Sequence, residues 1–208
     1  MTTTKKKVPI LPSVEERRKS LEARFPVWPR DTIAAHFQKA CKAYKDRPYL
    51  YMDDEEYTYE DIWRDAVQYA KAFMELGVKR RDHIAILMRN DATFPSLMIA
   101  SSIVGAVFIP INSMLKKDEL KYIISQSDTQ YLIFQQTKKD EGHQDMLLDN
   151  LADPNFQANN KLEKIIAINK DDSRTIDEQF LSWEDFLTKG NAVSDQELTE
   201  RQNESRYP

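Results

Sequence analysis

The chain contains 208 residues, of which 41% are hydrophobic and 31% are charged, and its formal net charge at pH 7 is −4. These values are typical of a soluble globular protein, and the length allows one large domain or one domain with a small addition. The longest apolar stretch, Leu97–Ile111, is interrupted by serine, glycine and proline and is shorter than the roughly 20 apolar residues that a membrane helix needs, so no transmembrane segment is predicted.

Residues 1–30 form a basic segment with eight Lys/Arg and three Glu, a net charge of +5 that leaves −9 for the remainder. Helical periodicity is weak, and Pro12, Pro26 and Pro29 interrupt it, so we predict a basic N-terminal arm over 1–30. No apolar core follows the first basic residues, as a secretory signal would require. We interpret the arm as a solvated extension, with peripheral contact to membrane phosphates as the alternative. Because no aromatic residues alternate with the charges, nucleic-acid binding is not predicted.

The first helix of the main body is predicted to begin at Asp31 or Thr32, since either side chain can cap it. From Ile33 to Tyr44, apolar residues recur at spacings of three and four, which indicates one buried face. Cys41, the only cysteine, lies on this face. A single cysteine excludes an intramolecular disulfide and suits the reducing cytoplasm, so we expect a buried structural thiol in a cytoplasmic protein.

Two short β-prone runs follow, at 49–52 and 56–58, and predict a small hairpin. Thr58 then begins a second helix. Asp61 stands three residues later, in a variant of the capping box in which its carboxylate returns to the N–H of the cap. Gly77 is predicted to end this helix in the left-handed conformation.

The remainder predicts a doubly wound α/β fold with a mainly parallel sheet. Four continuous apolar runs, as expected of parallel strands covered on both faces, occupy 83–88, 107–111, 131–134 and 165–168. Helices are predicted at 92–104, 117–127, 145–151 and 182–187, and 152–160 is predicted to be a loop. Strands that alternate with helices form a parallel sheet through right-handed crossovers. We therefore expect an α/β domain over 31–190 and a polar linker over 191–208.

Candidate binding residues follow the predicted strands, because ligands of open α/β sheets lie beyond the carboxyl ends of strands. These ends are polar, at 89–91, 112–114, 135–139 and 169–171. No catalytic set emerges: no serine has the flanking glycines of a nucleophile elbow. His36, His83 and His143 are too widely spaced in sequence to indicate zinc. The four glycines are never close together, so no phosphate cradle is predicted.

Four segments in order resemble the AMP-forming acyl-CoA synthetases of the adenylate-forming superfamily. Thr58-Tyr59-Glu60-Asp61-Ile62 is similar to the family's Thr/Ser-Tyr-x-Glu-Leu motif, and Leu76–Ile86 resembles its Leu-Gly-Val-x-x-Gly-Asp-x-Val-Ala segment. Val104–Asn112 is similar to Ala-Gly-Ala-x-x-x-Pro-Leu-Asn-Pro, and Leu120–Ile133 to the next helix and strand. The correspondence runs from about Thr32 to Phe134, and more loosely to Asp171. Arg81, Ser113 and Asp61 depart from the family's glycine, proline and glutamate, which leaves the subfamily open.

The resemblance implies an acid–thiol ligase in which ATP and a carboxylic acid, most simply a fatty acid, form an acyl-adenylate that CoA then attacks. It implies ATP, Mg²⁺ and CoA as cofactors of the full-length enzyme. The family's glycine-rich phosphate loop, its Tyr-Gly-x-Thr-Glu segment and its mobile C-terminal domain are absent from these residues. We therefore expect an N-terminal fragment that is inactive alone, with the ATP-binding part downstream of 208 and no catalytic or metal residue within it.

The resemblance also places the CoA nucleotide near strand ends of this domain. Positional candidates are Asn112 and Ser113, with Lys138 and Lys139 as point charges for phosphate. Two other interpretations stay open: an adenylation domain of a peptide synthetase or carrier-protein ligase, and a non-catalytic α/β binding module. The basic, proline-containing leader slightly favours a stand-alone CoA ligase. Further coding sequence with a glycine-rich loop would distinguish an enzyme from the module.

Overall fold

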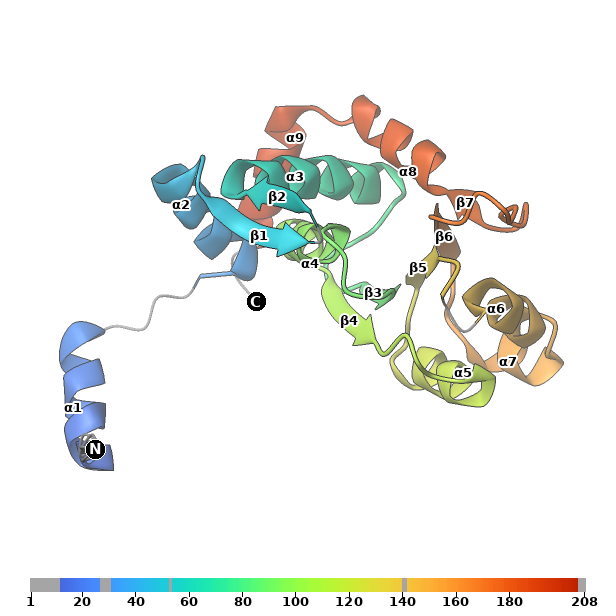
Figure 1. Ribbon diagram of the computed structural model, residues 1–208, viewed down its shortest axis with the longest axis horizontal. Coiled ribbons are helices and arrows are strands. Elements are labelled where there is room, and N and C mark those ends of the chain that lie inside the picture. Colours follow the sequence, from blue (N-terminus) through green and yellow to red (C-terminus); the bar gives the residue numbers. More distant parts are fainter. Residues whose placement is uncertain (1–11, 27–30, 53, 140–141, 206–208) are drawn as a thin grey trace, which may run out of the picture. The chain divides into compact units, whose positions relative to one another are not determined.

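The structure is a computed structural model that describes residues 12–26, 31–52, 54–139 and 142–205. The chain divides into two compact units, 1–30 and 31–208, which are described separately. In the first unit, helix α1 (Val14–Arg24) was not predicted from the sequence (Figure 1). It is stabilised by a capping box, in which the Ser13 hydroxyl accepts the N–H of Glu16 and the Glu16 carboxylate accepts the N–H of Ser13. None of its residues is buried.

The second unit begins with α2 (Ile33–Tyr44), the hairpin of β1 (Pro48–Met52) and β2 (Glu55–Thr58), and α3 (Tyr59–Glu75). The predicted caps are confirmed. The hydroxyl of Thr32 accepts the N–H of Ala35, and Thr58 and Asp61 form the reciprocal capping box of α3. Gly77 has a φ of 95°, the left-handed conformation expected at the end of α3.

The predicted parallel sheet is also confirmed, with one additional strand. The five strands are β3 (His83–Leu87), β4 (Val107–Ile111), β5 (Tyr131–Gln136), β6 (Lys164–Asn169) and β7 (Leu181–Ser182). Their spatial order is β4-β3-β5-β6-β7, and every neighbouring pair is parallel. Strand β7 was not predicted, because a strand of two residues has no periodicity.

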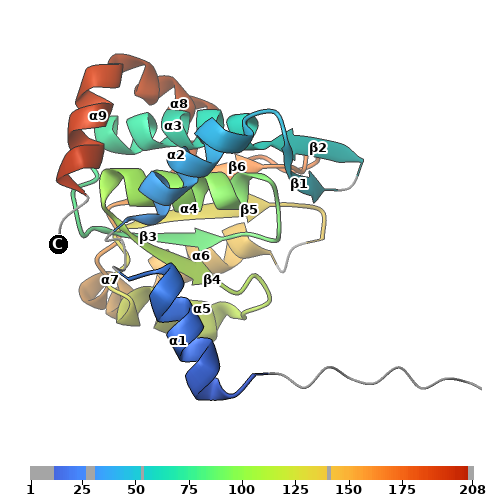
Figure 2. The ribbon, with the colours of Figure 1, turned by 90° about the vertical axis from the view of Figure 1, so that its left-hand side faces the viewer.

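Helices cover both faces of the sheet (Figure 2). One face packs against α2, α3, α4 (Thr93–Val104) and α8 (Trp183–Lys189); the other packs against α5 (Lys117–Gln126), α6 (His143–Leu151) and α7 (Pro154–Asn159). Side chains along β3 alternate between these two cores, since Ile84 and Ile86 join the first and Ala85 and Leu87 the second. Of the helices that the structure describes, none has the length and apolar character needed to cross a bilayer.

Two segments that were predicted to be irregular contain helices instead, because short caps and a few tertiary contacts order them. Within the predicted loop 152–160, the carboxylate of Asp153 accepts the N–H groups of Asn155 and Phe156 and begins α7. The predicted linker 191–208 instead contains η1 (Gly190–Ala192) and α9 (Asp195–Glu204), and its last three residues lie outside the described ranges. Helix α9 packs against α4 and buries Leu198 and Gln202, only two positions in a polar sequence.

Arg81 occupies a turn position that favours glycine. It joins α3 to β3 with a φ of 71°, while its N–H donates to the carbonyl of Gly105 at 2.8 Å. The left-handed conformation costs a side chain about 1–2 kcal/mol, and glycine loses about 0.5–1 kcal/mol through the flexibility of the unfolded chain. We therefore expect Arg81→Gly to raise the free energy of unfolding by about 0.5–1 kcal/mol in urea denaturation. Lys79→Gly, in the same turn without a positive φ, is the control and should lower it; equal losses in both variants would contradict the argument.

Candidate functional site

The carboxyl ends of the strands form the candidate site. The connection after β3 leads to α4 on one face of the sheet, whereas the connection after β5 leads to α6 on the opposite face (Figure 2). Because β3 and β5 are neighbours, their connections diverge to opposite faces of the sheet at this point. Such a switch point is where open α/β sheets bind ligands.

Asp91 is held at this switch point by three donors. Its Oδ2 accepts from Gln135 Nε2 at 3.1 Å and from Lys170 Nζ at 2.5 Å, and its Oδ1 accepts the N–H of Thr93 at 2.9 Å. Burial is the largest influence on the pKa of Asp91 and raises it, but the hydrogen bonds from Lys170 and Thr93 together lower the pKa below its usual value. Asp91 therefore stays charged at neutral pH and joins β3, β5 and β6 at their carboxyl ends.

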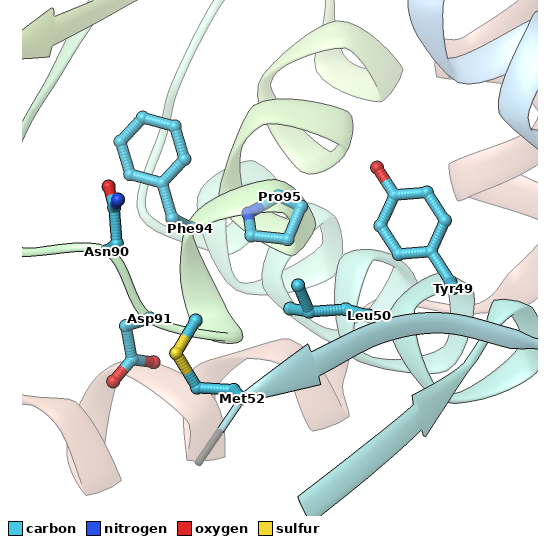
Figure 3. Close-up of a pocket in the computed structure, with 7 residues that line it drawn as sticks. All are labelled: Tyr49, Leu50, Met52, Asn90, Asp91, Phe94 and Pro95. Atoms are coloured by element: carbon cyan, nitrogen blue, oxygen red, sulfur yellow. The ribbon is translucent and has the colours of Figure 1, made fainter. Parts of the chain in front are cut away.

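A pocket of about 420 Å³ lies beside Asp91, between the hairpin and the start of α4. Its lining comes from β1, from the loop after β3 and from the first turn of α4: Tyr49, Leu50, Met52, Asn90, Asp91, Phe94 and Pro95 (Figure 3). Its volume is within the range of small-molecule clefts. Since the Asp91 carboxylate is already bonded, the pocket offers mainly apolar and aromatic contacts with the Asn90 amide at its rim.

The polar strand end at 89–91 was predicted, but the contribution of the hairpin and α4 to this pocket was not. Leu50 and Phe94 are far apart in sequence, and each has a local pattern that indicates only a strand or a helix. No local signal could have paired them.

Asn112 and Ser113 lie directly after β4, as predicted. The Asn112 Oδ1 accepts the N–H of Met114 at 3.0 Å, which forms a tight turn on the exposed edge. The Ser113 carbonyl faces inward and accepts from His143 Nε2 at 2.9 Å. This His143 contact was not predicted, because a lone histidine before a polar helix has no distinctive pattern.

Lys138 and Lys139 lie after β5 with exposed side chains. Arg89 Nη1 donates to the carbonyl of Lys139 at 3.2 Å, so the loops after β3 and β5 are bonded to each other. Across the ranges that the structure covers, no carboxylate forms a salt bridge with either lysine ammonium. The two lysines and the Asn112–Ser113 turn thus share one edge of the sheet, although β3 separates their strands.

Within the described residues, Cys41 and the acidic side chains form no reactive or metal-binding set. The Cys41 thiol is buried, and burial raises its pKa, so the thiolate is disfavoured. Among the described residues, no group of three or more histidine, cysteine, aspartate or glutamate side chains could hold a metal ion.

Comparison with known proteins gives one family. The family model for AMP-binding enzymes matches residues 37–202. YngI of Bacillus subtilis, a proposed acyl-CoA synthetase, is 26% identical over 179 residues, which cover 83% of this chain and 32% of YngI. Tyrocidine synthase 1 of Brevibacillus parabrevis is 23% identical over 124 residues, 59% of this chain and 11% of that protein. The chain therefore spans a third or less of the length of these relatives.

The fold is also similar to solved structures. A proposed long-chain-fatty-acid CoA ligase from Rhodopseudomonas palustris aligns with a TM-score of 0.62 at 21% identity and covers 79% of this chain and 37% of that chain. At this level of identity the similarity establishes the fold.

Proposed function

The chain belongs to the AMP-binding enzyme family, of whose fold it forms the N-terminal part, and we propose that the whole protein is an AMP-forming acid–CoA ligase. It would activate a carboxylic acid, most simply a fatty acid, with ATP and Mg²⁺ to an acyl-adenylate, and the CoA thiolate would then displace AMP. The observation that carries this proposal is the family match over 37–202, which includes all five strands of the sheet. The match to YngI supports an acyl-CoA synthetase within the family.

The described residues do not fit the ATP phosphates. Of the four glycines, Gly77, Gly105 and Gly142 have positive φ values and stand at the ends of helices, while Gly190 packs close to the backbone of α3. Each glycine therefore has a local structural role, and none forms the cluster of N–H groups that cradles phosphate. We propose that residues 31–190 supply an α/β subdomain of the enzyme, and that the ATP site is formed by the rest of the protein.

The residues at the carboxyl edge of the sheet suit the CoA nucleotide better than the ATP phosphates. Lys138 and Lys139 present exposed ammonium groups that form no salt bridge among the described residues, and Lys138 is close enough to Asp171 to help lower the pKa of that carboxyl. Asn112 and Ser113 lie at the same edge. We therefore propose that these four residues contact CoA in the whole enzyme. For the protein as a whole we also propose a cytoplasmic location, with peripheral membrane contact by the basic arm 1–30 as an option.

An adenylation domain that loads a carrier protein is the second candidate, and the match to tyrocidine synthase 1 favours it. It would share the acyl-adenylate step but replace CoA by a carrier-bound thiol. A non-catalytic α/β binding module is the third interpretation, and sequencing the gene beyond codon 208 would support or remove it. A glycine-rich phosphate loop encoded there would support an enzyme.

We expect the 208-residue chain to show no ATP–pyrophosphate exchange above the buffer rate with any acid, because its described part has no phosphate cradle. The whole protein should exchange pyrophosphate with its acid and form a thioester with CoA. Radiolabelled pyrophosphate incorporation measures the first step, and thioester formation with CoA against carrier protein measures the second. Exchange by the 208-residue chain would contradict the assignment of the ATP site, and transfer only to carrier protein would favour the second candidate.

A further inference from the structure

His143 is buried between two backbone segments that end different strands. Its side chain is 1% exposed at the start of α6. Nε2 lies 2.9 Å from the carbonyl oxygen of Ser113, in the loop after β4, and Nδ1 lies 3.2 Å from the carbonyl oxygen of Gln135, near the end of β5. Because β3 lies between β4 and β5, the histidine bridges two strands that do not pair with each other.

Both partners of His143 are hydrogen-bond acceptors, which restricts how the ring can bind them. A neutral imidazole carries one N–H and can donate to one carbonyl, whereas the ring with both nitrogens protonated donates to both. The shorter contact is from Nε2 to Ser113, so the bond to the loop after β4 requires a proton on Nε2. The neutral tautomer with its proton on Nε2 meets this requirement, and so does the doubly protonated ring.

A second buried donor on α6 acts on the same stretch of chain. Asn150 is seven residues after His143, two turns along the helix and on the same side. Its side chain is 2% exposed, and its Nδ2 donates to the carbonyl of Lys117 at 3.2 Å, four residues beyond Ser113. Helix α6 therefore bonds to the loop after β4 through His143, at the carboxyl edge of the sheet, and to the first residue of α5 through Asn150.

We propose that His143 is a positioning residue for the Asn112–Ser113 turn, and that it sets the place of this turn in the CoA subsite. The expected effect on CoA binding rests on the proposed function, whereas the contact between His143 and Ser113 does not depend on it. The bond to Ser113 fixes the backbone of a turn whose remaining described bonds are internal, from the N–H of Met114 to Asn112 Oδ1 and from the N–H of Leu115 to the Asn112 carbonyl. Without the bond from His143, the turn loses its attachment to α6 and its internal bonds open more often.

Two amide substitutions separate the two hydrogen bonds of the ring. The side-chain nitrogen of asparagine takes the place of Nδ1, and that of glutamine takes the place of Nε2. His143→Gln should therefore keep the bond to Ser113, while His143→Asn should keep only the bond to Gln135. Hydrogen exchange of the 208-residue chain is expected to show about fivefold to tenfold faster exchange at Met114 and Leu115 in His143→Asn, the loss of about one hydrogen bond, and little change in His143→Gln.

In the whole enzyme, His143→Asn should raise the KM for CoA by about fivefold, while the kcat and the pyrophosphate exchange rate stay within about twofold, and His143→Gln should restore the KM. Equal exchange at Met114 in both variants would overturn the positioning role. Faster exchange at Met114 in His143→Asn with an unchanged KM for CoA would support the positioning role but contradict the assignment of the turn to the CoA subsite. Nitrogen NMR of the unsubstituted chain provides a test that needs no variant, because an Nε2 without a proton would also overturn the proposal.

Discussion

Replacing Phe73 by alanine is expected to lower the free energy of unfolding of the 208-residue chain by about 3–5 kcal/mol. The Phe73 side chain is fully buried on α3, and its ring centroid lies 5.2 Å from that of Phe186 on α8. Truncation removes the ring from the larger core between the helices and the sheet, and it leaves a cavity that this packed layer can only partly close. Urea denaturation followed by circular dichroism measures the loss.

The size of this loss is decisive because domains are only marginally stable. A typical free energy of unfolding is about 5–15 kcal/mol, so the substitution would remove about a fifth or more of it. Tyr122→Ala is the control: its side chain is 62% exposed on α5, and we expect a change within about 0.5 kcal/mol. A loss below about 1 kcal/mol for Phe73→Ala would mean that α3 and α8 do not pack in the folded chain as they do in the structure.

The sheet could be predicted because its central strands are covered on both faces. The first four residues of β5 are buried and apolar, and such stretches appear in the sequence as unbroken apolar runs that need no knowledge of the fold. Helices α2 and α3 were equally clear, since Thr32 and Thr58 cap them in the way that their neighbours in the sequence indicate. Burial and local capping are both properties of short segments.

The missed elements depend on contacts across the fold. Helix α9 has a polar sequence, and it is held by burial of Leu198 and by an ion pair from Lys71 of α3 to Asp195 at 2.7 Å. Strand β7 is only two residues long and is defined by its pairing with β6. Neither the packing partner nor the pairing partner is visible in the local sequence, so composition wrongly indicated a linker.

The candidate site was predictable in position but not in construction. Strand ends were identified from the sequence, and Asn112 does follow β4 at the carboxyl edge. The bonds that build the edge join residues far apart in the chain, such as Asp91 with Lys170 and Ser113 with His143. A single sequence contains no signal for such pairs, and the roles of Lys138 and Lys139 stay predictions.

In the whole enzyme, the double substitution Lys138→Ala and Lys139→Ala is expected to raise the KM for CoA by about tenfold, with pyrophosphate exchange within about twofold of the unsubstituted rate. Two exposed ammonium groups near phosphate contribute about 0.5–1 kcal/mol each, and 1.4 kcal/mol corresponds to a factor of ten. The loop itself should stay in place, because Arg89 bonds to the backbone carbonyl of Lys139 and the substitution leaves that carbonyl intact. Initial rates over a range of CoA concentrations measure the effect.

A matched control removes the same charge from the opposite end of the sheet. Lys161 lies before β6 and Lys164 is its first residue, and both are exposed. Their double substitution to alanine should leave the KM for CoA within about twofold, because charges separated by more than a Debye length of about 8–10 Å are largely screened at physiological salt. If both double variants raise the KM equally, the effect comes from net charge and the proposed subsite is wrong.

Salt then separates a direct phosphate contact from other causes of a raised KM. Screening weakens exposed charge pairs, so the KM of the unsubstituted enzyme should rise with added potassium chloride while that of the Lys138/Lys139 variant rises less. The ratio between the two KM values should therefore fall from about ten toward one as the salt concentration approaches 1 M, where the Debye length is about 3 Å. A ratio that stays constant over this range would assign the loss to altered loop structure, and an unchanged KM at low salt would place the CoA phosphates elsewhere.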